Sequence, residues 1–451
     1  MNIIIIGAGK LGDALVSCLT KEGHDITLIE TDKELIETIV GKYDVLGISG
    51  NGANIDTLRQ AGVQKADIVI ATTANDELNV LCCLLSSKLG ARHTVARVRE
   101  TRYSKQLAFM RQELGISMVV NPELDAANEI SRILRSSRTI KIDSFAKGRA
   151  DLVELRVEDH SPLEGVKMSE LSSRLKCKVL ICAVQRGEKT IIPDGRFVLQ
   201  TGDRVHITAS HIELEKLFKT LGLSKQRVHS AMIVGGSTTA YYLVGQLIDS
   251  GFRIKIVEQD RDKCERFSET FPKATVICGN GTNDSLMDEE GLGQYDACVA
   301  LTGIDEENII ISLLARSKQV PSIITKVNNS SLLRVINELS VDNTISPKDL
   351  TANHIVKYVR SQESNDSSSV QTLYKLFDNS IEAVEFVVTE DCACTHIPLK
   401  ELKKKNNLLI ACIVRAGQTL IPGGNDTMEV GDSVVVVSSD LYLRNLDEIL
   451  A

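Results

Sequence analysis

Hydrophobic residues in the first hundred positions form short uninterrupted runs, separated by longer stretches of mixed polarity. The runs cover residues 3–6, 26–29, 45–48, 68–71 and 94–98. Continuous apolar runs of this length predict parallel strands buried on both faces, and the stretches between them predict the connecting helices. Because crossovers between parallel strands are right-handed, the pattern predicts an α/β, Rossmann-like doubly wound domain.

The same pattern returns in the second half of the chain. A strand ending in an acid, DITLIETD from Asp25, recurs as RIKIVEQD from Arg253, and the loop SGNGAN from Ser49 recurs as CGNGTN from Cys278. Repetition of a whole module at one spacing indicates an internal duplication.

A smaller pattern, with β-branched runs broken by Gly, Pro and Asp, also occurs twice, at residues 179–207 and 408–437. It predicts two small β-rich α+β domains. The chain is therefore expected to be an A-B-A-B duplication, in which A is the Rossmann-like domain and B is the smaller domain. The Ser-rich stretch 361–370 is predicted to be a flexible linker. The expected domains are two nucleotide-binding domains at 1–140 and 228–360, and two smaller domains at 141–224 and 370–451.

An amphipathic helix is predicted directly after Asn121-Pro122. Leu124, Ala127, Ile130 and Leu134 form an apolar stripe at helical spacing. The stripe has two interpretations, packing within the first domain or a dimer-forming crossover helix, and the pattern alone does not separate them.

A glycine-rich turn follows the first predicted strand and precedes a predicted helix. In a G-x-G-x-x-G turn the first glycine makes the turn tight, the second lets the backbone approach a pyrophosphate, and the third lets the helix pack on the sheet. The N–H groups at the start of the helix also favour phosphate. The turn reads Gly7-Ala8-Gly9-Lys10-Leu11-Gly12.

An acidic residue, Glu30, ends the second predicted strand. A carboxylate at this point can accept hydrogen bonds from both ribose hydroxyls of an adenosine, and together with Asp32 it disfavours the 2′-phosphate of NADP. The turn and the acid therefore predict a site for an NAD(H)-type nucleotide, against the alternative of a purely structural glycine turn.

Two loops and an arginine follow other strands, at the edge where doubly wound folds bind ligands. Asn51 lies between two glycines after the third strand, Thr73 and Ala74 follow the fourth, and Arg97 ends the fifth. Ordinary turn chemistry remains an alternative for each loop. Arg97 could contact a phosphate or a neighbouring subunit, or simply lie on the surface.

The second copy of the fingerprint is degraded. Its middle glycine is replaced by Ser237, whose side chain lies where a pyrophosphate would approach. Glu258, the counterpart of Glu30, is retained, as is a cation at Lys326. The second site is therefore expected to bind nucleotide weakly, to bind a different nucleotide, or to be structural. Its turn reads Gly235-Gly236-Ser237-Thr238-Thr239-Ala240.

Composition narrows the classes of function. A net charge of −8 without a basic stripe argues against a nucleic-acid binder, and no apolar run reaches the length of a membrane span. Eleven scattered cysteines predict reduced thiols in the cytoplasm. Cys82-Cys83 is expected in the core, and the stretch from Cys392 to His396 is expected to be a plain loop because its spacing is not that of a common zinc motif.

No catalytic constellation accompanies the predicted nucleotide site. A hydride-transfer enzyme needs a substrate domain with a positioned acid or base, and the smaller domains offer none. The chain is therefore predicted not to be an enzyme. An NAD-dependent dehydrogenase with duplicated domains is kept as the alternative.

These residues carry a family resemblance. The segment GAGKLG, Glu30, the SGNGAN and TTANDE loops, VARVR and VVNPE resemble the nucleotide-binding RCK-N, or Trk-N, domains that regulate potassium conductance. The repeated IIP…G…GD segment is similar to their companion C-terminal domain. The A-B-A-B arrangement resembles, over nearly the whole chain, the regulatory subunits of Trk potassium-uptake systems.

The resemblance implies a homotetrameric ring that binds NAD(H), or ATP or ADP, and gates a membrane-embedded partner of the TrkH or TrkG type. The ring would lie on the cytoplasmic face of the inner membrane. A regulator of another cation transporter remains an alternative. The contacts implied by the resemblance are Gly7 to Leu11, Glu30, Thr73, Ala74 and Arg97 in the first site, and Gly235 to Thr239 and Glu258 in the second.

Overall fold

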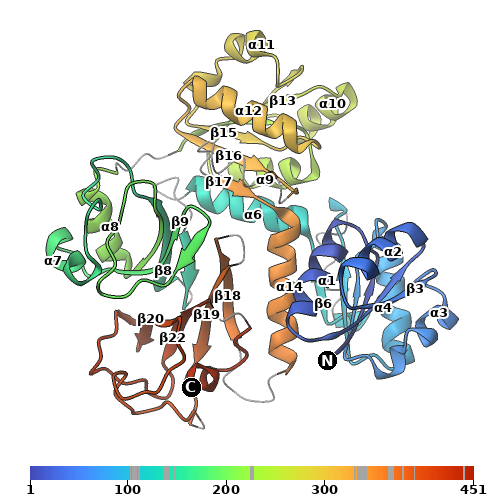
Figure 1. The fold of residues 1–451 in the computed structure, drawn as a ribbon. Coiled ribbons are helices and arrows are strands. Elements are labelled where there is room, and N and C mark those ends of the chain that lie inside the picture. The colour runs from blue at the N-terminus through green and yellow to red at the C-terminus, as the bar shows by residue number, and fades with distance from the viewer. Residues whose placement is uncertain are drawn as a thin grey trace. The chain divides into compact units, whose positions relative to one another are not determined.

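A computed structural model shows four sheets arranged in two compact units (Figure 1). The first unit comprises Met1–Thr139 and Arg227–Val356, and the second comprises Ile140–Gln226 and Lys357–Ala451. The structure describes residues 1–101, 103, 109, 112–135, 142–146, 148–223, 228–329, 332, 343–363, 370–377, 380–390, 392–439 and 442–451.

The first sheet of the first unit is fully parallel, with the order β3-β2-β1-β4-β5-β6. Its order reverses between β1 and β4, which is where doubly wound sheets form a ligand crevice. The strands are β1 (Asn2–Ile6), β2 (Asp25–Glu30), β3 (Leu46–Ser49), β4 (Ile68–Ala71), β5 (His93–Arg97) and β6 (Met118–Val120). The helices are α1 (Lys10–Lys21), α2 (Lys33–Lys42), α3 (Ile55–Gln60), η1 (Val63–Lys65) and α4 (Asp76–Leu89).

The second sheet of this unit repeats the first, with the parallel order β14-β13-β12-β15-β16-β17. Its strands are β12 (Ser230–Val234), β13 (Arg253–Glu258), β14 (Thr275–Cys278), β15 (Ala297–Ala300), β16 (Ser322–Lys326) and β17 (Asn343–Ile345). Its helices are α9 (Thr238–Asp249), α10 (Arg261–Thr270), α11 (Asp284–Glu289), η4 (Leu292–Gln294) and α12 (Asp305–Ser317).

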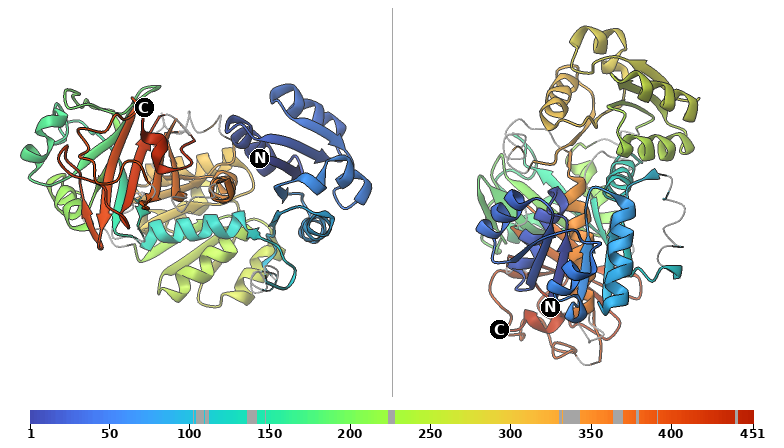
Figure 2. Two further views of the ribbon diagram at one scale, coloured as in Figure 1. Left: turned by 90° about the horizontal axis from the view of Figure 1, so that it is seen from below. Right: turned by 90° about the vertical axis from the view of Figure 1, so that its right-hand side faces the viewer.

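The predicted amphipathic helix is α6 (Pro122–Arg135), which leaves the first sheet and packs on the second (Figure 2). Ala127, Ile130 and Leu134 are buried in one cluster with residues of β12 and α9. The packing is therefore a crossover and not intradomain, and it occurs within a single chain. Its counterpart α14 (Pro347–Glu363) meets α6 where the Thr351 hydroxyl donates a 2.9 Å hydrogen bond to Asp125.

The second unit holds two antiparallel sheets that repeat one topology, β10-β9-β11-β8-β7 and β21-β20-β22-β19-β18. The first has β7 (Ile142–Phe145), β8 (Ala150–Arg156), β9 (Leu180–Arg186), β10 (Lys189–Ile191) and β11 (Arg204–Ala209), with η3 (Met168–Glu170), α7 (Leu171–Leu175) and α8 (His211–Thr220). The second has β18 (Val370–Leu376), β19 (Ile381–Val387), β20 (Leu408–Arg415), β21 (Gln418–Leu420) and β22 (Ser433–Ser438), with η5 (Leu446–Ile449).

The repeated Gly-Asp pair of the smaller domains closes a loop in both copies. Gly202 and Gly431 adopt left-handed backbone angles, with φ of 87° and 89°. The aspartate that follows each glycine accepts two hydrogen bonds from an arginine, Arg186 in the first copy and Arg415 in the second. Glycine is needed for the left-handed turn and the acid for the ion pair.

The duplicated α/β fold class is confirmed, and Cys82-Cys83 lies in the core as predicted. The predicted linker at 361–370 is wrong at its ends, because α14 continues to Glu363 and β18 begins at Val370. Residues 364–369 lie outside the described residues. None of the described helices has both the length and the apolar character that a membrane span requires.

Candidate nucleotide-binding site

The glycine turn between β1 and α1 lies at the carboxyl edge of the first sheet. Gly7 has a φ of 100°, and a Cβ there would lie 2.8 Å from the Thr73 backbone nitrogen. A Cβ on Gly12 would lie 2.0 Å from the Gly7 carbonyl oxygen. These two glycines are therefore required by the protein's own packing.

The middle glycine differs from the other two because the space beside it is open. A Cβ on Gly9 would meet no atom within 4 Å. Gly9 is the N-cap of α1 and supplies no side-chain hydrogen bond to it. The first N–H groups of α1 are thus left without a side-chain cap at an exposed position, which is the arrangement that binds phosphate. The side chains of Ala8 and Leu11 are buried, whereas Lys10 is exposed.

Glu30 is held against this turn by hydrogen bonds. Its carboxylate accepts from the Ala8 N–H at 2.7 Å and from the N–H and hydroxyl of Thr31 at 2.7 and 2.9 Å. Partial burial raises the pKa of Glu30, but the hydrogen bonds from Ala8, Thr31 and Asp32 outweigh that effect and leave the pKa below its ordinary value. The side chain is therefore ionised and oriented at the edge of the sheet.

The loop after β4 is organised by a buried residue that sequence reasoning had not placed in the site. Asn79 Oδ1 accepts from the Thr73 N–H and hydroxyl at 2.8 and 2.7 Å. Its amide donates to the carbonyls of Thr73 and Arg97 at 3.1 and 2.9 Å. The signal was present in the repeat, because Asn308 occupies the same place in the second copy and makes the corresponding bonds to Thr302 and Lys326.

Two arginines bind the same loop from the end of β5. Arg97 donates through Nη2 to the Thr73 carbonyl, and Arg99 donates to the Ala74 carbonyl at 2.6 Å. Ala74 takes part in these bonds through its carbonyl, and its methyl side chain is exposed. The structure therefore brings Gly7, Thr73 and Arg97 together. It also brings Glu30 and Ala8 together across the glycine turn.

Four side-chain atoms of the charged residues at this edge make no hydrogen bond. The atoms concerned are Arg97 Nε, Arg99 Nε, Asp76 Oδ1 and Glu123 Oε2. Burial, followed by the charge of Arg99, lowers the pKa of Arg97, and burial raises the pKa of Glu123. Arg99 lies 3.9 Å from Asp76 and 4.0 Å from Glu123, so these charges pair with one another at this edge of the sheet.

Asn51 does not join the other predicted residues through any hydrogen bond that the described part of the chain shows. Its Oδ1 accepts from the Ala53 N–H at 2.9 Å, as in an ordinary Asx turn. Gly52 is packed tightly, because a Cβ there would lie 2.3 Å from Ile6.

The second copy satisfies its own helix N-terminus. Ser237 is the N-cap of α9, and its hydroxyl accepts from the Ala240 N–H at 3.4 Å. Thr238 is exposed and Thr239 is buried. The serine thus uses an N–H group of its own helix, a role that the sequence did not indicate.

The acid of the second copy is also less accessible. Glu258 is only 7% exposed and accepts from the N–H groups of Gly236 and Asp260. A Cβ on Gly236 would lie 2.9 Å from the Glu258 carboxylate and 3.2 Å from the Phe267 ring. Gly235 repeats the left-handed turn, with a φ of 103°.

The two copies influence each other electrostatically within the first unit. Burial lowers the pKa of Lys326, which ends β16. Asp305 of the same domain and Glu123 of the first domain raise that pKa, while Lys10 and Lys263 lower it further. Charges of the first copy therefore act at the edge of the second sheet.

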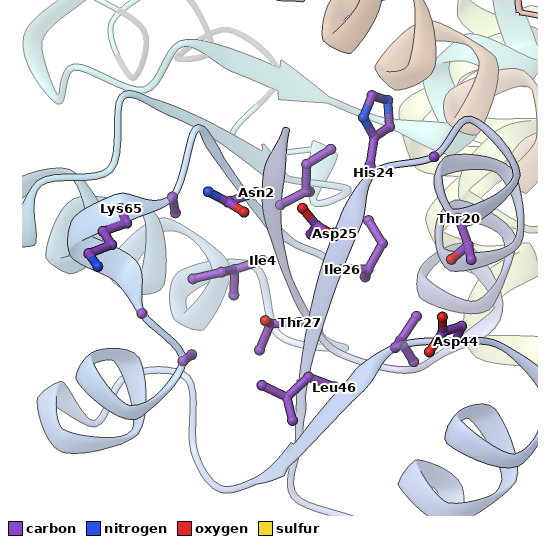
Figure 3. Close-up of a pocket in the computed structure, with 16 residues that line it drawn as sticks. Asn2, Ile4, Thr20, His24, Asp25, Ile26, Thr27, Asp44, Leu46 and Lys65 are labelled. Atoms are coloured by element: carbon purple, nitrogen blue, oxygen red, sulfur yellow. The ribbon is translucent and has the colours of Figure 1, made fainter.

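A cavity of about 600 Å³ lies elsewhere, at the amino ends of β1 to β3 (Figure 3). Asn2, Asp25 and Lys65 are among its lining residues, and none of the predicted site residues is. In the second copy Lys255 occupies the position of Thr27, and it pairs with Glu290 at 2.8 Å. This cavity is therefore distinct from the carboxyl edge.

Two doubly wound domains with glycine-turn fingerprints, each followed by a small antiparallel domain, define a class of duplicated regulatory proteins. Residues 3–122 and 231–347 match the family model of the TrkA-N domain, and residues 152–222 and 383–451 match that of the TrkA-C domain. The chain belongs to the TrkA family of potassium-uptake proteins.

Full-length relatives support this membership. The chain is 31% identical over 449 residues to "Trk system potassium uptake protein TrkA homolog" of Archaeoglobus fulgidus, covering 100% of both chains. It is 28% identical to "Trk system potassium uptake protein TrkA" of Halomonas elongata, covering 98% of this chain and 96% of the relative. The family prediction is confirmed, and with it the prediction that the chain is not an enzyme.

Solved structures share the fold at lower identity. The RCK domain of GsuK superimposes with a TM-score of 0.62 at 16% identity, covering 97% of this chain and 92% of that chain. A structure described as "GsuK channel bound to NAD" gives a TM-score of 0.60 at 16% identity, covering 97% and 77%.

Proposed function

We propose that this chain is the nucleotide-binding regulatory subunit of a potassium-uptake system, and that it gates a membrane-embedded partner by changing conformation when nucleotide binds. The observation that carries this proposal is the open N-terminus of α1 beside Gly9, with the ionised Glu30 at the same edge of the sheet. The family membership supports the potassium-uptake role.

In this proposal an NAD(H)-type nucleotide occupies the first copy. Its pyrophosphate accepts hydrogen bonds from the N–H groups at the start of α1, and its adenosine ribose donates to Glu30. Glu30 Oε2 accepts one N–H in the structure, so it retains capacity for a further donor. GsuK, a channel of the same fold, has been solved with NAD and with ADP, which supports a nucleotide of this class.

The remaining contacts are assigned on the same basis. Thr73, Ala74 and Arg97 lie in or against the loop after β4, where the phosphates of a bound nucleotide would extend, and Asn51 lies in the neighbouring loop after β3. The second copy, with Gly235 to Thr239 and Glu258, is proposed to bind more weakly because Ser237 already caps α9.

The assembly is proposed from the family. Four domains with boundaries at 1–140, 141–224, 228–360 and 370–451 would assemble as a homotetramer on the cytoplasmic face of the inner membrane. The partner would be of the TrkH or TrkG type. A ligand shifts the equilibrium between two conformations only through its different affinity for them, so gating requires that nucleotide bind one state of the ring more tightly.

The test is calorimetric titration of the purified chain with NADH, NAD and ATP, repeated with Gly9→Asp and Ser237→Asp. Gly9→Asp is expected to weaken binding at the stronger site by at least about tenfold, because its carboxylate repels the pyrophosphate. Ser237→Asp is the matched control, placed at the same position of the second copy. It is expected to leave nucleotide binding at the stronger site unchanged.

The variants then go into vesicles with the membrane partner for measurement of potassium flux. Gly9→Asp is expected to abolish the response of flux to nucleotide. Binding and flux that survive Gly9→Asp in a folded protein would refute the proposal.

A further inference from the structure

Two cysteines approach each other at the carboxyl edge of the second sheet. Cys278 is the last residue of β14, and Cys264 lies in the first turn of α10. Cys264 Sγ donates to the Glu258 carbonyl at 3.2 Å, and Cys278 Sγ lies 3.9 Å from the next carbonyl, that of Gln259. The two thiols therefore sit on consecutive carbonyls at the end of one strand.

The backbone and the thiols both support this proximity. Cys278 is the register partner of Glu258 in the parallel ladder between β13 and β14. The Cys278 thiol also lies near enough to Cys264 to contribute to the raised pKa of Cys264. All eleven cysteines lie in the described residues, and none of them is in a disulfide.

The pair differs from the other cysteines in access to solvent. Cys278 is exposed, Cys18 is half-buried and the remaining nine, Cys264 among them, are buried. An exposed thiol beside a buried one, on consecutive carbonyls, is the arrangement of an oxidisable cysteine beside a resolving cysteine.

The internal duplication supplies a comparison within the same chain. The residues at the equivalent places of the first copy are Ile36 in α2 and Ser49 at the end of β3. The first copy thus keeps the same backbone without either thiol, so the fold itself does not require sulfur at these two places.

We propose that Cys264 and Cys278 form a peroxide-sensitive pair, which closes to a disulfide across the end of β13 in the second Rossmann-like domain. This modification site is independent of whether nucleotide binds the chain.

The chemistry balances with a peroxide as oxidant. The Cys278 thiolate attacks one peroxide oxygen and breaks the O–O bond, giving a sulfenic acid and, after proton uptake, one water from hydrogen peroxide. The sulfur of Cys264 then attacks the sulfenic sulfur, the S–O bond breaks, and the proton lost by Cys264 leaves with the hydroxide as a second water. Two thiols are oxidised by two electrons, and one peroxide is reduced.

The order of the two steps follows from burial. Burial, followed by the neighbouring Cys278 thiol, raises the pKa of Cys264 to about 12, so Cys264 is a poor first nucleophile. Exposed Cys278 meets the oxidant first. Closure links α10 to β14 and thereby restrains the turn that carries Glu258 and Asp260.

The test uses the full chain, treated with hydrogen peroxide, blocked with a maleimide and digested for mass spectrometry. A peptide pair joined through Cys264 and Cys278 is expected, with a mass about 2 Da below the sum of the reduced peptides. Dithiothreitol is expected to restore maleimide labelling of both residues. With Cys264→Ser, the sulfenic acid on Cys278 is expected to persist and to react with dimedone.

Cys18→Ser is the control, and it is expected to leave the linked pair unchanged. Oxidation of Cys278 to the sulfinic acid in the unmutated chain while Cys264 stays reduced would overturn the proposal. So would a linkage from Cys278 to any other cysteine. Nucleotide binding is not needed in any arm of this experiment, so its outcome is separate from that of the titration above.

Discussion

The three glycines of the first turn lack side chains for different physical reasons. Gly7 needs its left-handed backbone, and Gly12 is pressed against the Gly7 carbonyl. Gly9 has open space beside it, so the protein's own atoms place no demand on it. In the proposed function the reason for a glycine at this position is the close approach of a pyrophosphate to the backbone.

This difference predicts effects of different size for alanine at two positions. Gly12→Ala is expected to lower the free energy of unfolding by about 1–3 kcal/mol, because its Cβ would meet a backbone carbonyl that cannot rotate away. Gly9→Ala is expected to cost less than about 1 kcal/mol. Urea denaturation of both variants measures the difference, and equal losses would contradict the assignment of Gly12 to packing.

Glu30 predicts a dependence of stability on pH. Its pKa is lower in the folded chain than in the unfolded one, so the unfolded state binds the proton more readily. The stabilisation is therefore complete above the unfolded value of about 4.5 and is lost as the pH falls through the folded pKa. Melting temperatures of the unmutated chain and Glu30→Gln should differ at pH 7 and converge as the pH falls through the folded pKa of Glu30.

The matched control for this measurement is Glu34→Gln, which changes an exposed carboxylate three positions beyond Thr31 in the chain. It is expected to leave the melting temperature at pH 7 within the error of the measurement. A Glu30→Gln chain as stable as the unmutated one at pH 7 would show that the hydrogen bonds from Ala8 and Thr31 contribute nothing net.

At the scale of elements, a single buried amide joins the loop after β4 to the end of β5. Asn79 and Asn308 make corresponding hydrogen bonds in the two copies. One side chain therefore pairs with the Thr73 N–H and with the carbonyls of Thr73 and Arg97. Buried polar groups need such partners, which gives a physical reason for an asparagine at this place in both copies.

Asn79→Ala is expected to destabilise the chain by about 1–3 kcal/mol, because it removes the partner of the Thr73 N–H and of the Arg97 carbonyl. Asn79→Asp keeps the acceptor and loses the donors, so it is expected to remain clearly destabilised. Denaturant unfolding measures both variants. Recovery of full stability by Asn79→Asp would show that the bonds to the two carbonyls are unimportant.

The strands were largely predictable from the chain, with β1, β2, β4 and β5 coinciding with apolar runs to within one residue and β3 displaced by one. The edge strands β6 and β17 were not predicted. Each has three residues. A run so short gains its structure from pairing with β5 or β16, and a local pattern does not contain that partner.

At the scale of the whole molecule, a fully buried ion pair ties the end of α14 into the second unit. Arg360 and Glu382 are 0% and 1% exposed, and they form two hydrogen bonds of 3.0 and 2.8 Å. Glu382 also accepts from the Tyr442 N–H at 3.1 Å. Such a pair is costly to bury and still more costly to break on one side.

Arg360→Met is therefore expected to destabilise the chain by about 3–5 kcal/mol, because it leaves the Glu382 charge buried and uncompensated. The double variant Arg360→Met/Glu382→Gln removes that charge and keeps an acceptor for Tyr442. It is expected to recover part of the loss in thermal or urea unfolding. A double variant less stable than Arg360→Met would contradict this account.

Sequence patterning determined the duplication, the α/β class of the larger domains, the glycine turns and the acids that end β2 and β13. These features depend on residues that are close together in the sequence, because the periodic placement of apolar side chains and the chemistry of turns are both local. Only the tertiary structure decided that α6 packs on the other Rossmann-like domain, that Ser237 caps its own helix, and that Cys264 meets Cys278. Each of these depends on which surfaces or side chains meet after folding. An apolar stripe in the sequence shows that a surface will be buried, but it does not show which partner will bury it.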